Sequence, residues 1–423
     1  MAFFVLVDCN NFYVSCERAF NPRLENQPIV ILSNNDGCII SRSNEAKKLG
    51  IPMGAAFHQW KSFCHGHGVH VFSSNYELYG DMSHRIMTLL QKFCTTMEIY
   101  SIDEAFLFFD KMNSVDLNTY LLNVRYQLKK CTGLPTSIGF AQTKTLAKVA
   151  NLIAKKRTVE GVYNFSDPMC QDQVLEKLSV QEVWGVGHRL ARKLESLNIT
   201  TAKILRDSDT KQLRDSFSIV LERTITELRG TSCLPLVEYQ QPKQIISSRS
   251  FGKKVTALVD LEEAISHYAA KAAHKLRKQN CFAQGVLVFL NTNIFRPQDP
   301  QYENHARFRF PYPTADTGEI VKYAKACLGT IYRMGFTYHK AGMMLLDLTP
   351  NTFEQFDMVL DGHAQTHAKS IEIMKVVDSI NQCMGKNTLF FCAEGIKRAW
   401  QIKCDRRTPC YTTRWSDLAI AYC

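Results

Sequence analysis

The sequence predicts an α+β fold that is divided among several domains. The chain has 423 residues and 45% hydrophobic composition, which is enough to bury two or more cores. Strand patterns alternate with helical patterns in the first 165 residues, and the segment 245–348 has the order β-α-β-β-α-β. This second order predicts a ferredoxin-like module within a larger mixed protein.

Three acidic residues lie where strand patterns end or are interrupted. Asp8 closes the apolar run 3–7, and Asp103 and Glu104 separate the runs 98–102 and 105–109, which we expect to form a hairpin of two buried strands. Three carboxylates on one sheet repel one another unless cations lie between them, and two divalent ions about 3.5 to 4 Å apart solve this problem in phosphoryl transfer. The pattern therefore favours nucleotidyl transfer over the simpler explanation that acids mark strand ends.

Asp103 and Glu104 are neighbours in the sequence, which limits how they can share a site. Successive strand residues face opposite sides of a sheet, so Asp103 and Glu104 can share one site only if the chain bends or bulges between them.

A nucleotide site also needs groups that recognise sugar and phosphate. The turn 9–13 after Asp8 would bring Tyr13 back beside the carboxylates, where a rigid ring could exclude a ribose hydroxyl. The segment 28–41 predicts a hairpin whose turn, 34–37, contains an Asp-Gly pair. The cations that could neutralise phosphates are Arg42, Lys47, Lys48, Lys144, Lys148, Lys155 and Lys156. Each lysine alone is more often a solvated surface charge.

Two further segments point to nucleic acid. The sequence 183–188 precedes a helical pattern, 189–197, and follows another, as in a helix-hairpin-helix, in which Gly185 and Gly187 allow a close backbone approach and Arg189 lies nearby. An ordinary helix linker is the alternative. Residues 242–352 hold 15 basic and 8 acidic side chains, most of the net charge of +11. This excess predicts phosphate binding that weakens steeply with salt, although a solvated basic face is the alternative.

Within this basic segment, one strand offers several donors suited to a sugar-phosphate backbone. They are Ser248, Arg249, Ser250 and, just after them, Lys253. Because no base-reading pattern accompanies them, we expect sequence-tolerant contact.

The composition predicts a cytoplasmic protein. No segment approaches the roughly 20 apolar residues of a membrane span, which predicts no membrane association. The 15 cysteines are scattered without any Cys-x-x-Cys pair, which favours reduced thiols over zinc sites or disulfides.

An ordered set of motifs resembles the Y-family translesion DNA polymerases, and among them the bacterial UmuC branch, the catalytic subunit of the SOS mutagenic polymerase. The motifs occupy residues 8–13, 33–38, 44–47, 72–77, 100–106, 142–148 and 411–418. The resemblance runs essentially end to end. It implies a right-hand polymerase with palm and fingers in 1–165, a helical thumb in 166–241, a DNA-binding little finger in 242–352 and a partner-binding extension in 353–423.

The resemblance also implies roles for individual residues. Asp8, Asp103 and Glu104, with the carbonyl of Cys9, would hold two Mg²⁺ ions. The implied nucleotide-binding residues are Phe12, Tyr13 as steric gate, Ser41, Lys47 and Lys155, and the implied base-pair lid is Ile39 and Ile40. Many relatives have Arg and Tyr where this chain has Lys47 and Asn44, so the finger contacts differ in detail. A small lid would tolerate distorted templates, and low fidelity is the consequence.

The implied partners are primer-template DNA, deoxynucleoside triphosphates, a processed UmuD-like dimer, the RecA filament and the sliding clamp. The segment with Gln355, Phe356 and Met358 is similar to a clamp-binding peptide, although Val359 replaces the usual Leu or Phe. An irregular amphipathic connector is the alternative there. The protein would associate with the bacterial nucleoid when active.

Three functions are consistent with parts of this sequence. The first is an error-prone DNA polymerase that copies damaged templates in the SOS response without a proofreading exonuclease. The second is a noncatalytic DNA-binding regulator that retains the polymerase fold, and the third is a nucleotidyl cyclase, which has no need of a helix-hairpin-helix or a basic module. The carboxylate trio and Tyr13 favour the polymerase.

Overall fold

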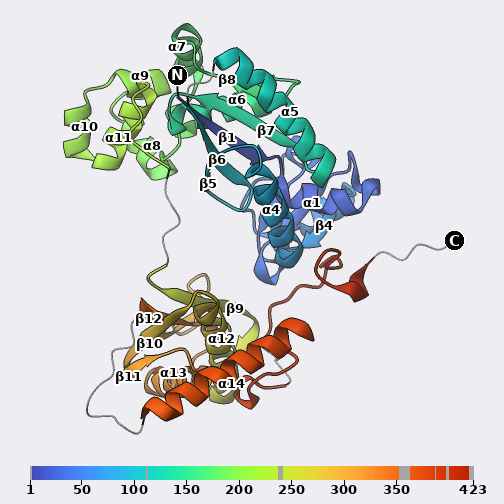
Figure 1. Ribbon diagram of the computed structural model, residues 1–423, viewed down its shortest axis with the longest axis vertical. Coiled ribbons are helices and arrows are strands. Elements are labelled where there is room, and N and C mark those ends of the chain that lie inside the picture. Colours follow the sequence, from blue (N-terminus) through green and yellow to red (C-terminus); the bar gives the residue numbers. More distant parts are fainter. Residues whose placement is uncertain are drawn as a thin grey trace, which may run out of the picture. The chain divides into compact units, whose positions relative to one another are not determined.

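The computed structural model describes residues 2–110, 113–236, 242–351, 363–385, 387–396 and 400–418. The chain divides into two compact units, the first made of Met1–Tyr239 and Asp405–Cys423 and the second of Gln240–Cys404 (Figure 1). Both units mix helices with strands, as predicted. Within the described residues, no helix is long and apolar enough to cross a membrane.

The first unit is built on a sheet of five strands in the order β5-β6-β1-β7-β8. Their bounds are β1 Phe3–Cys9, β5 Thr96–Ile99, β6 Glu104–Phe109, β7 Thr136–Ala141 and β8 Val162–Asn164. Strand β1 is buried along its whole length because it pairs with β6 on one side and β7 on the other. The predicted hairpin is present as β5 and β6, but β5 is a half-exposed edge strand, so only β6 matches the expected buried strand.

The two faces of this sheet are covered by different helices. The helices that pack on one face are α1 (Phe12–Phe20), α4 (Tyr76–Leu90) and α5 (Ser114–Thr132), and α6 (Lys144–Arg157) packs on the other. Alternation along β1 directs Val5 and Val7 toward the first face and Phe4 and Leu6 toward α6. Asp8, the next even position, therefore lies on the α6 face.

Helix α6 approaches the sheet unusually closely. A Cβ atom on Gly139 of β7 would lie 2.1 Å from the backbone nitrogen of Asn151 in α6. The Asn151 side-chain amide is buried at this crossing and donates hydrogen bonds to the carbonyls of Leu6 (3.2 Å) and Ser137 (2.8 Å). These contacts fix the distance of α6 from β1 and β7.

A smaller sheet in the first unit has the order β3-β2-β4. Its elements are β2 Ile29–Leu32, β3 Ile39–Arg42 and β4 His70–Ser73, with α2 (Asn44–Lys48) and α3 (Phe57–Gly66) beside them and η1 (Pro22–Leu24) before them. The predicted hairpin is confirmed, but its turn contains η2 (Asn34–Asp36). The turn lies at residues 34–37, as predicted; Asn35 and Asp36 adopt positive φ there, whereas Gly37 has φ −79°.

A set of short helices completes the first unit. They are α7 (Pro168–Lys177), η3 (Val180–Glu182), α8 (His188–Glu195), α9 (Ala202–Asp207), α10 (Thr210–Ser216) and α11 (Ile219–Leu228). Their apolar side chains share one core with Leu146 and Ala150 of α6. Helix α6 thus joins the large sheet to this helical region.

The second unit has the predicted β-α-β-β-α-β order. Its elements are β9 Ile245–Val255, α12 Leu258–Lys278, β10 Cys281–Thr292, β11 Glu303–Thr314, α13 Thr317–Ile331 and β12 Tyr338–Pro350. The sheet has the order β11-β10-β12-β9, and α12 and α13 pack on the same face of it (Figure 1).

The carboxyl-terminal region is divided between the two units. Helix α14 (His363–Cys383) packs on the second unit, where Asp378 pairs with Arg277 at 2.7 Å, and η4 (Cys392–Glu394) follows. The final segment, with η5 (Trp415–Asp417), belongs instead to the first unit. The proposed clamp peptide at Gln355, Phe356 and Met358 lies outside the described residues.

The crossing of α6 over Gly139 generates a stability prediction. Gly139→Ala should lower the free energy of unfolding by about 3 kcal/mol, because its methyl group would displace the α6 backbone. The matched control is Gly80→Ala in α4, where a Cβ meets nothing within 4 Å and should be neutral or stabilise by up to about 1 kcal/mol. Thermal unfolding of the full-length variants measures both, and an equal midpoint for the two would contradict this account of the crossing.

Candidate active site

Asp8 and Glu104 lie directly opposite each other on neighbouring strands. The register of β1 and β6 pairs their Cα positions, and Glu104 shares the α6 face with Phe106. Asp8 is only 5% exposed, and its carboxyl group lies within hydrogen-bonding reach of Glu104. Because two like charges directly opposite each other destabilise a sheet, this pair needs compensating positive charge.

Helix α6 supplies that charge from two of its turns. Lys155 places Nζ 2.6 Å from Oδ2 of Asp8, and Lys148 places Nζ 2.7 Å from Oε2 of Glu104. Seven residues separate the two lysines, which is about two helical turns, so both reach the same face. Lys148 also lies 4.4 Å from the centre of the Tyr100 ring. By contrast, Lys144 is buried and pairs with Glu98 at the edge strand.

The two carboxyl groups respond differently to this environment. Burial raises the pKa of Asp8 to about 7, an effect that Lys155 opposes. Burial acts in the same direction on Glu104, but the hydrogen bonds with Asp8 and Lys148 outweigh it and lower the pKa of Glu104. A further cation beside Asp8 would favour the ionised form of both carboxyl groups.

Asp103 stands on a bend at the tip of the same hairpin. The Ser101 hydroxyl donates to Oδ1 of Asp103 (2.6 Å) and accepts from the backbone amides of Asp103 (3.3 Å) and Glu104 (3.1 Å). The amide of Cys9 donates to the carbonyl of Asp103 at 2.9 Å, which holds the tip against the end of β1. The bend required by the sequence is thus present, and Ser101, which we did not identify from the sequence, maintains it.

The charge of Asp103 acts on the α1 side of the sheet. It contributes, after burial, to the raised pKa of Cys9, Tyr13 and Cys16. Asp8 and Glu104 face α6, and the charge of Asp103 acts on Tyr13 and Cys16 of α1. The Cys9 amide joins the bend that carries Asp103 to the end of β1.

The donor chemistry of this place fits magnesium. Carboxylate oxygens and a backbone carbonyl, here that of Cys9, are the hard ligands that Mg²⁺ takes. In the described part of the chain, however, no group of three His, Cys, Asp or Glu side chains is already gathered as a ligand set. Lys155, Lys148 and Ser101 engage the carboxyl groups instead. Metal ligation by Asp8, Cys9, Asp103 and Glu104 stays a prediction.

Tyr13 lies beside these carboxylates as the sequence predicted. Its ring stacks on Tyr79 with centroids 4.5 Å apart and an interplanar angle of 17°, and it meets the edge of Tyr76 at 6.1 Å. Burial raises the pKa of the half-buried Tyr13 phenol, and the nearby charge of Asp103 adds to this. Two rings of α4 therefore restrict the orientation of Tyr13.

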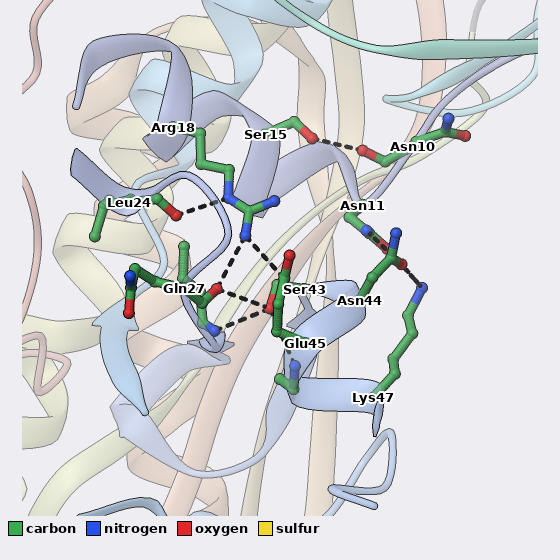
Figure 2. A network of polar contacts seen from close by, with 12 residues as sticks. Asn10, Asn11, Ser15, Arg18, Leu24, Gln27, Ser43, Asn44, Glu45 and Lys47 are labelled. Atoms are coloured by element: carbon green, nitrogen blue, oxygen red, sulfur yellow. Dashed lines mark hydrogen bonds and ion pairs between the residues drawn. The ribbon is translucent and has the colours of Figure 1, made fainter. Parts of the chain in front are cut away.

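Lys47 is held toward the same place by a polar network (Figure 2). Its Nζ donates to Oδ1 of Asn11 at 2.6 Å and to Oδ1 of Asn44 at 3.4 Å, and Asn11 also donates to Asn44 at 3.1 Å. Burial lowers the pKa of Lys47, the positive charges of Arg42 and Lys155 lower it further, and Asp8 opposes them. The charges of Lys47, Lys155 and Asp8 therefore lie close enough to interact, so the two lysines belong to one site.

Arg18 anchors the helix that carries Lys47. Its guanidinium donates to the carbonyls of Leu24 (3.1 Å) and Gln27 (2.9 Å) and pairs with Glu45 of α2 at 2.9 Å (Figure 2). Sequence analysis did not identify this residue, because its partners are spread over three separate elements.

The remaining predicted nucleotide contacts are more buried. Phe12 and Ser41 are buried, and Ile39 is fully buried in the core of the small sheet, 0% exposed. Ile40, the neighbour of Ile39 on β3, is half-buried and faces the other way. Of the two predicted lid residues, only Ile40 has a side chain available for contact.

The predicted hairpin between helices is a tight, exposed turn. Gly185 has φ +89°, a conformation that favours glycine, and Gly187 is the N-cap of α8. Gly185, Gly187 and Arg189 are exposed. The indole of Trp184 donates to the hydroxyl of Tyr100 at 3.1 Å, which ties this turn to the hairpin that carries Asp103.

The sheet face of the second unit opposite α12 and α13 carries a mixed polar and basic surface. We call it the open face; its outward positions include Ile246, Ser248, Ser250, Leu287, Phe289, His305, Arg307, Arg309, Lys340 and Met344. The alternation of β9 places Arg249 on the other side, where its charge acts on the buried Tyr268. Lys253 is exposed near the end of β9. DNA binding by these residues stays a prediction.

Solved structures define the class of this fold. A Y-family DNA polymerase chimera, Dbh-Dpo4(243-245)-Dbh, superposes with a TM-score of 0.63 at 22% identity, covering 82% of this chain and 100% of that one. The insertion ternary complex of Dbh DNA polymerase gives a TM-score of 0.54 at 20% identity with the same coverage. The protein therefore has the Y-family DNA polymerase fold, as the sequence predicted.

Sequence comparison defines the family. Residues 7–151 match the impB/mucB/samB family, residues 242–358 match its C-terminal domain, and residues 372–421 match a domain of unknown function (DUF4113). Protein UmuC of Salmonella typhimurium strain LT2 is 43% identical over 419 residues, 98% of this chain and 99% of the relative. Protein ImpB of Salmonella typhimurium is 41% identical over 99% of both chains. The chain belongs to the impB/mucB/samB family, and the predicted likeness to UmuC is confirmed.

The bend at Ser101 can be tested without any assay of activity. Ser101→Ala removes three hydrogen bonds that orient Asp103 and Glu104, so Mn²⁺ affinity should fall about tenfold if these acids bind a metal. Electron paramagnetic resonance of free Mn²⁺ measures it. Ser62→Ala, an exposed serine of α3, is the control and should bind Mn²⁺ as the wild type does. Equal affinity in both variants would contradict the role of Ser101.

Proposed function

We propose that this protein is a template-directed DNA polymerase that copies damaged DNA. The observation that carries the proposal is the opposition of Asp8 and Glu104 in the sheet, with Asp103 on the adjoining bend and Tyr13, Lys47 and Lys155 around them. The Y-family fold and the relation to UmuC support it, as does a relative named DNA polymerase IV in Moorella thermoacetica, 27% identical over 84% of this chain and 88% of its own.

In this proposal Asp8, Asp103, Glu104 and the Cys9 carbonyl hold two magnesium ions. When bound, the metal pair activates the primer 3′-hydroxyl and stabilises the charge on the triphosphate and its leaving group. Asp8 and Glu104 would hold the metal in place of their present lysine partners, and the ammonium groups of Lys155 and Lys148 would be available to phosphate oxygens. The bend held by Ser101 presents Asp103 to the same ions.

The surrounding residues bind and select the nucleotide. Lys47, oriented by Asn11 and Asn44, and Lys155 neutralise the incoming triphosphate. The Tyr13 ring, stacked on Tyr79, occupies the space that a ribose 2′-hydroxyl needs and so favours deoxynucleotides. Phe12 and Ser41 shape this pocket from the core, and Ile40 with Ile39 behind it covers the new base pair. The small size of this lid supports tolerance of distorted templates and low fidelity.

DNA is held by surfaces that contact phosphates rather than bases. In the first unit, Gly185, Gly187 and Arg189 offer exposed amides and a cation at the start of α8. In the second unit, the open face supplies the hydroxyl groups of Ser248 and Ser250 and the charges of its basic residues. Lys253 lies near the end of β9, and Arg249 would reach the DNA from the other side of that strand. In domain terms, 1–165 form palm and fingers, 166–241 the thumb, 242–352 the little finger and 353–423 the extension.

The proposal extends to a cellular setting, which the relation to UmuC supports. We place the enzyme in the SOS response, without a proofreading exonuclease, with a processed UmuD-like dimer, the RecA filament and the sliding clamp as partners, the last through Gln355, Phe356 and Met358. The competing function is a noncatalytic DNA-binding regulator with the same fold. Such a protein would not need the opposed acids, and catalysis separates the two.

The catalytic role is tested with Asp103→Asn, which keeps the shape of the side chain and removes its charge. Primer extension across an abasic site, with the proposed partners present, should fall by about 10²- to 10³-fold while DNA binding is retained. Asp116→Asn, on the exposed first turn of α5, is the control and should extend normally. Extension that survives in Asp103→Asn would remove this residue from catalysis, and a wild-type chain that binds DNA without extending it would favour the regulator.

Sugar selection is tested at Tyr13. Tyr13→Ala should raise kcat/KM for ribonucleotides relative to deoxynucleotides by at least about tenfold, because the ring no longer fills the space of the 2′-hydroxyl. Single-nucleotide insertion kinetics give the ratio. The control is Tyr126→Ala, an exposed tyrosine of α5. An unchanged ratio in Tyr13→Ala would show that another residue acts as the gate.

A further inference from the structure

The last described segment of the chain, 405–418, folds onto the first unit; we call it the returning segment. Its backbone joins the end of β4, where the Ser73 amide donates to the carbonyl of Arg406 at 3.1 Å and the Ser73 hydroxyl accepts from the Arg406 amide at 3.0 Å. The Tyr411 ring stacks on Phe20 of α1 with centroids 5.0 Å apart. Figure 1 draws the segment in red beside the blue elements of that unit. It therefore contacts the end of β4 and helix α1, which carries Tyr13.

Asn75 connects the returning segment to the start of α4. This side chain is 0% exposed, and its amide nitrogen lies 3.1 Å from each of three acceptors, the carbonyls of Thr408 and Pro409 and the Thr408 hydroxyl. Its oxygen accepts from the Leu78 amide at 3.3 Å and so caps α4. One buried amide thus orders the first turn of α4, which carries Tyr76 and Tyr79.

Glu17 forms a second connection. It is 2% exposed and lies one helical turn after Tyr13 on α1. Its Oε1 accepts from the Tyr79 hydroxyl at 2.6 Å and from the Thr408 hydroxyl at 3.2 Å. Burial raises the pKa of Glu17, and these two hydrogen bonds oppose that shift. Within the described residues, Thr408 and Tyr79 are therefore the side-chain donors that stabilise the charge of this nearly buried carboxylate.

The two connections converge on one ring. Thr408 contacts Glu17 and Asn75, Glu17 fixes the hydroxyl of Tyr79, and the Tyr79 ring stacks on Tyr13. Loss of the Thr408 hydroxyl would leave Glu17 with Tyr79 as its side-chain donor among the described residues, while the carbonyls of Thr408 and Pro409 still accept from the Asn75 amide. The change at Glu17 would loosen its hold on the Tyr79 hydroxyl and so on the ring that stacks on Tyr13.

We propose that the returning segment positions Tyr13 and so sets how strictly the active site rejects ribonucleotides, with Thr408 and Asn75 as positioning residues. This inference rests on the proposed role of Tyr13 as the gate. It assigns a task to part of a region, 372–421, that matches only a domain of unknown function, and it differs from the partner-binding role that we expected for the whole extension.

The test uses full-length protein with a series of changes at one position. Thr408→Val keeps the shape of the side chain and removes its hydroxyl, so the ratio of ribonucleotide to deoxynucleotide kcat/KM should rise about threefold to tenfold. Thr408→Ser retains the hydroxyl and should restore the wild-type ratio, which a loss of packing would not allow. Thr413→Val, an exposed threonine of the same segment, should leave the ratio unchanged. An unchanged ratio in Thr408→Val, when Tyr13→Ala alters it, would overturn the inference alone.

A double variant separates this inference from the proposed function. If Thr408 acts through Tyr13, adding Thr408→Val to Tyr13→Ala should change the ratio no further. Additive effects would show that Thr408 acts by another route and would overturn the inference. If Tyr13→Ala itself leaves the ratio unchanged, the gate assignment fails and the inference falls with it.

Hydrogen exchange provides a measurement that needs no catalysis. In protein without nucleotide or DNA, Thr408→Val should speed exchange of the amides in residues 75–82 by at least about threefold, while Thr408→Ser and Thr413→Val should match the wild type. Unchanged exchange in Thr408→Val would overturn the inference whether or not the protein is a polymerase.

Discussion

The opposition of Asp8 and Glu104 on paired strands is the constraint around which the first unit is organised. Two carboxylates at directly opposed positions of a buried sheet are unfavourable unless positive charge compensates them. Helix α6 meets this need with Lys148 and Lys155, and its close approach over Gly139 brings both ammonium groups within reach. The same helix shares its other side with the core of α7 to α11. Helix α6 therefore connects the acidic pair with the helical region.

The candidate site is assembled from both faces of one sheet edge. Glu104 faces α6, whereas the bend held by Ser101 sends Asp103 toward α1 and Tyr13. Around this edge, polar side chains form hydrogen bonds and ion pairs between elements that are far apart in sequence. Arg18 ties α2 to α1, and Asn75 ties α4 to the returning segment. Arg18 is half-buried and Asn75 is buried, and each makes several hydrogen bonds. These bonds restrict the orientation of the groups that would contact the nucleotide.

Much of the fold was predictable because it depends on local pattern. The β-α-β-β-α-β order of the second unit, the hairpin that contains Asp103 and Glu104, and the helix that begins after Gly187 follow from hydrophobic period and turn residues. Local pattern did not predict two details of these elements. The turn at 34–37 was predicted from its Asp-Gly pair, but the positive φ values fall on Asn35 and Asp36 rather than on Gly37. For β5, an alternating pattern did not reveal that the strand lies at an edge.

Sequence pattern alone was sufficient for the identity of the acidic trio, the need for a bend between Asp103 and Glu104, and the family, because each depends on residue types within short segments. Only the tertiary structure decided which lysines pair with which carboxylates and that Ile39 is buried in the core while Ile40 is not. It also decided that the returning segment bonds to Glu17, the residue that holds the Tyr79 hydroxyl. These features arise from strand register and from hydrogen bonds such as that between Asn75 and Thr408, 333 positions apart. Periodicity within a segment carries no information about such pairings, since they depend on how separate elements pack together.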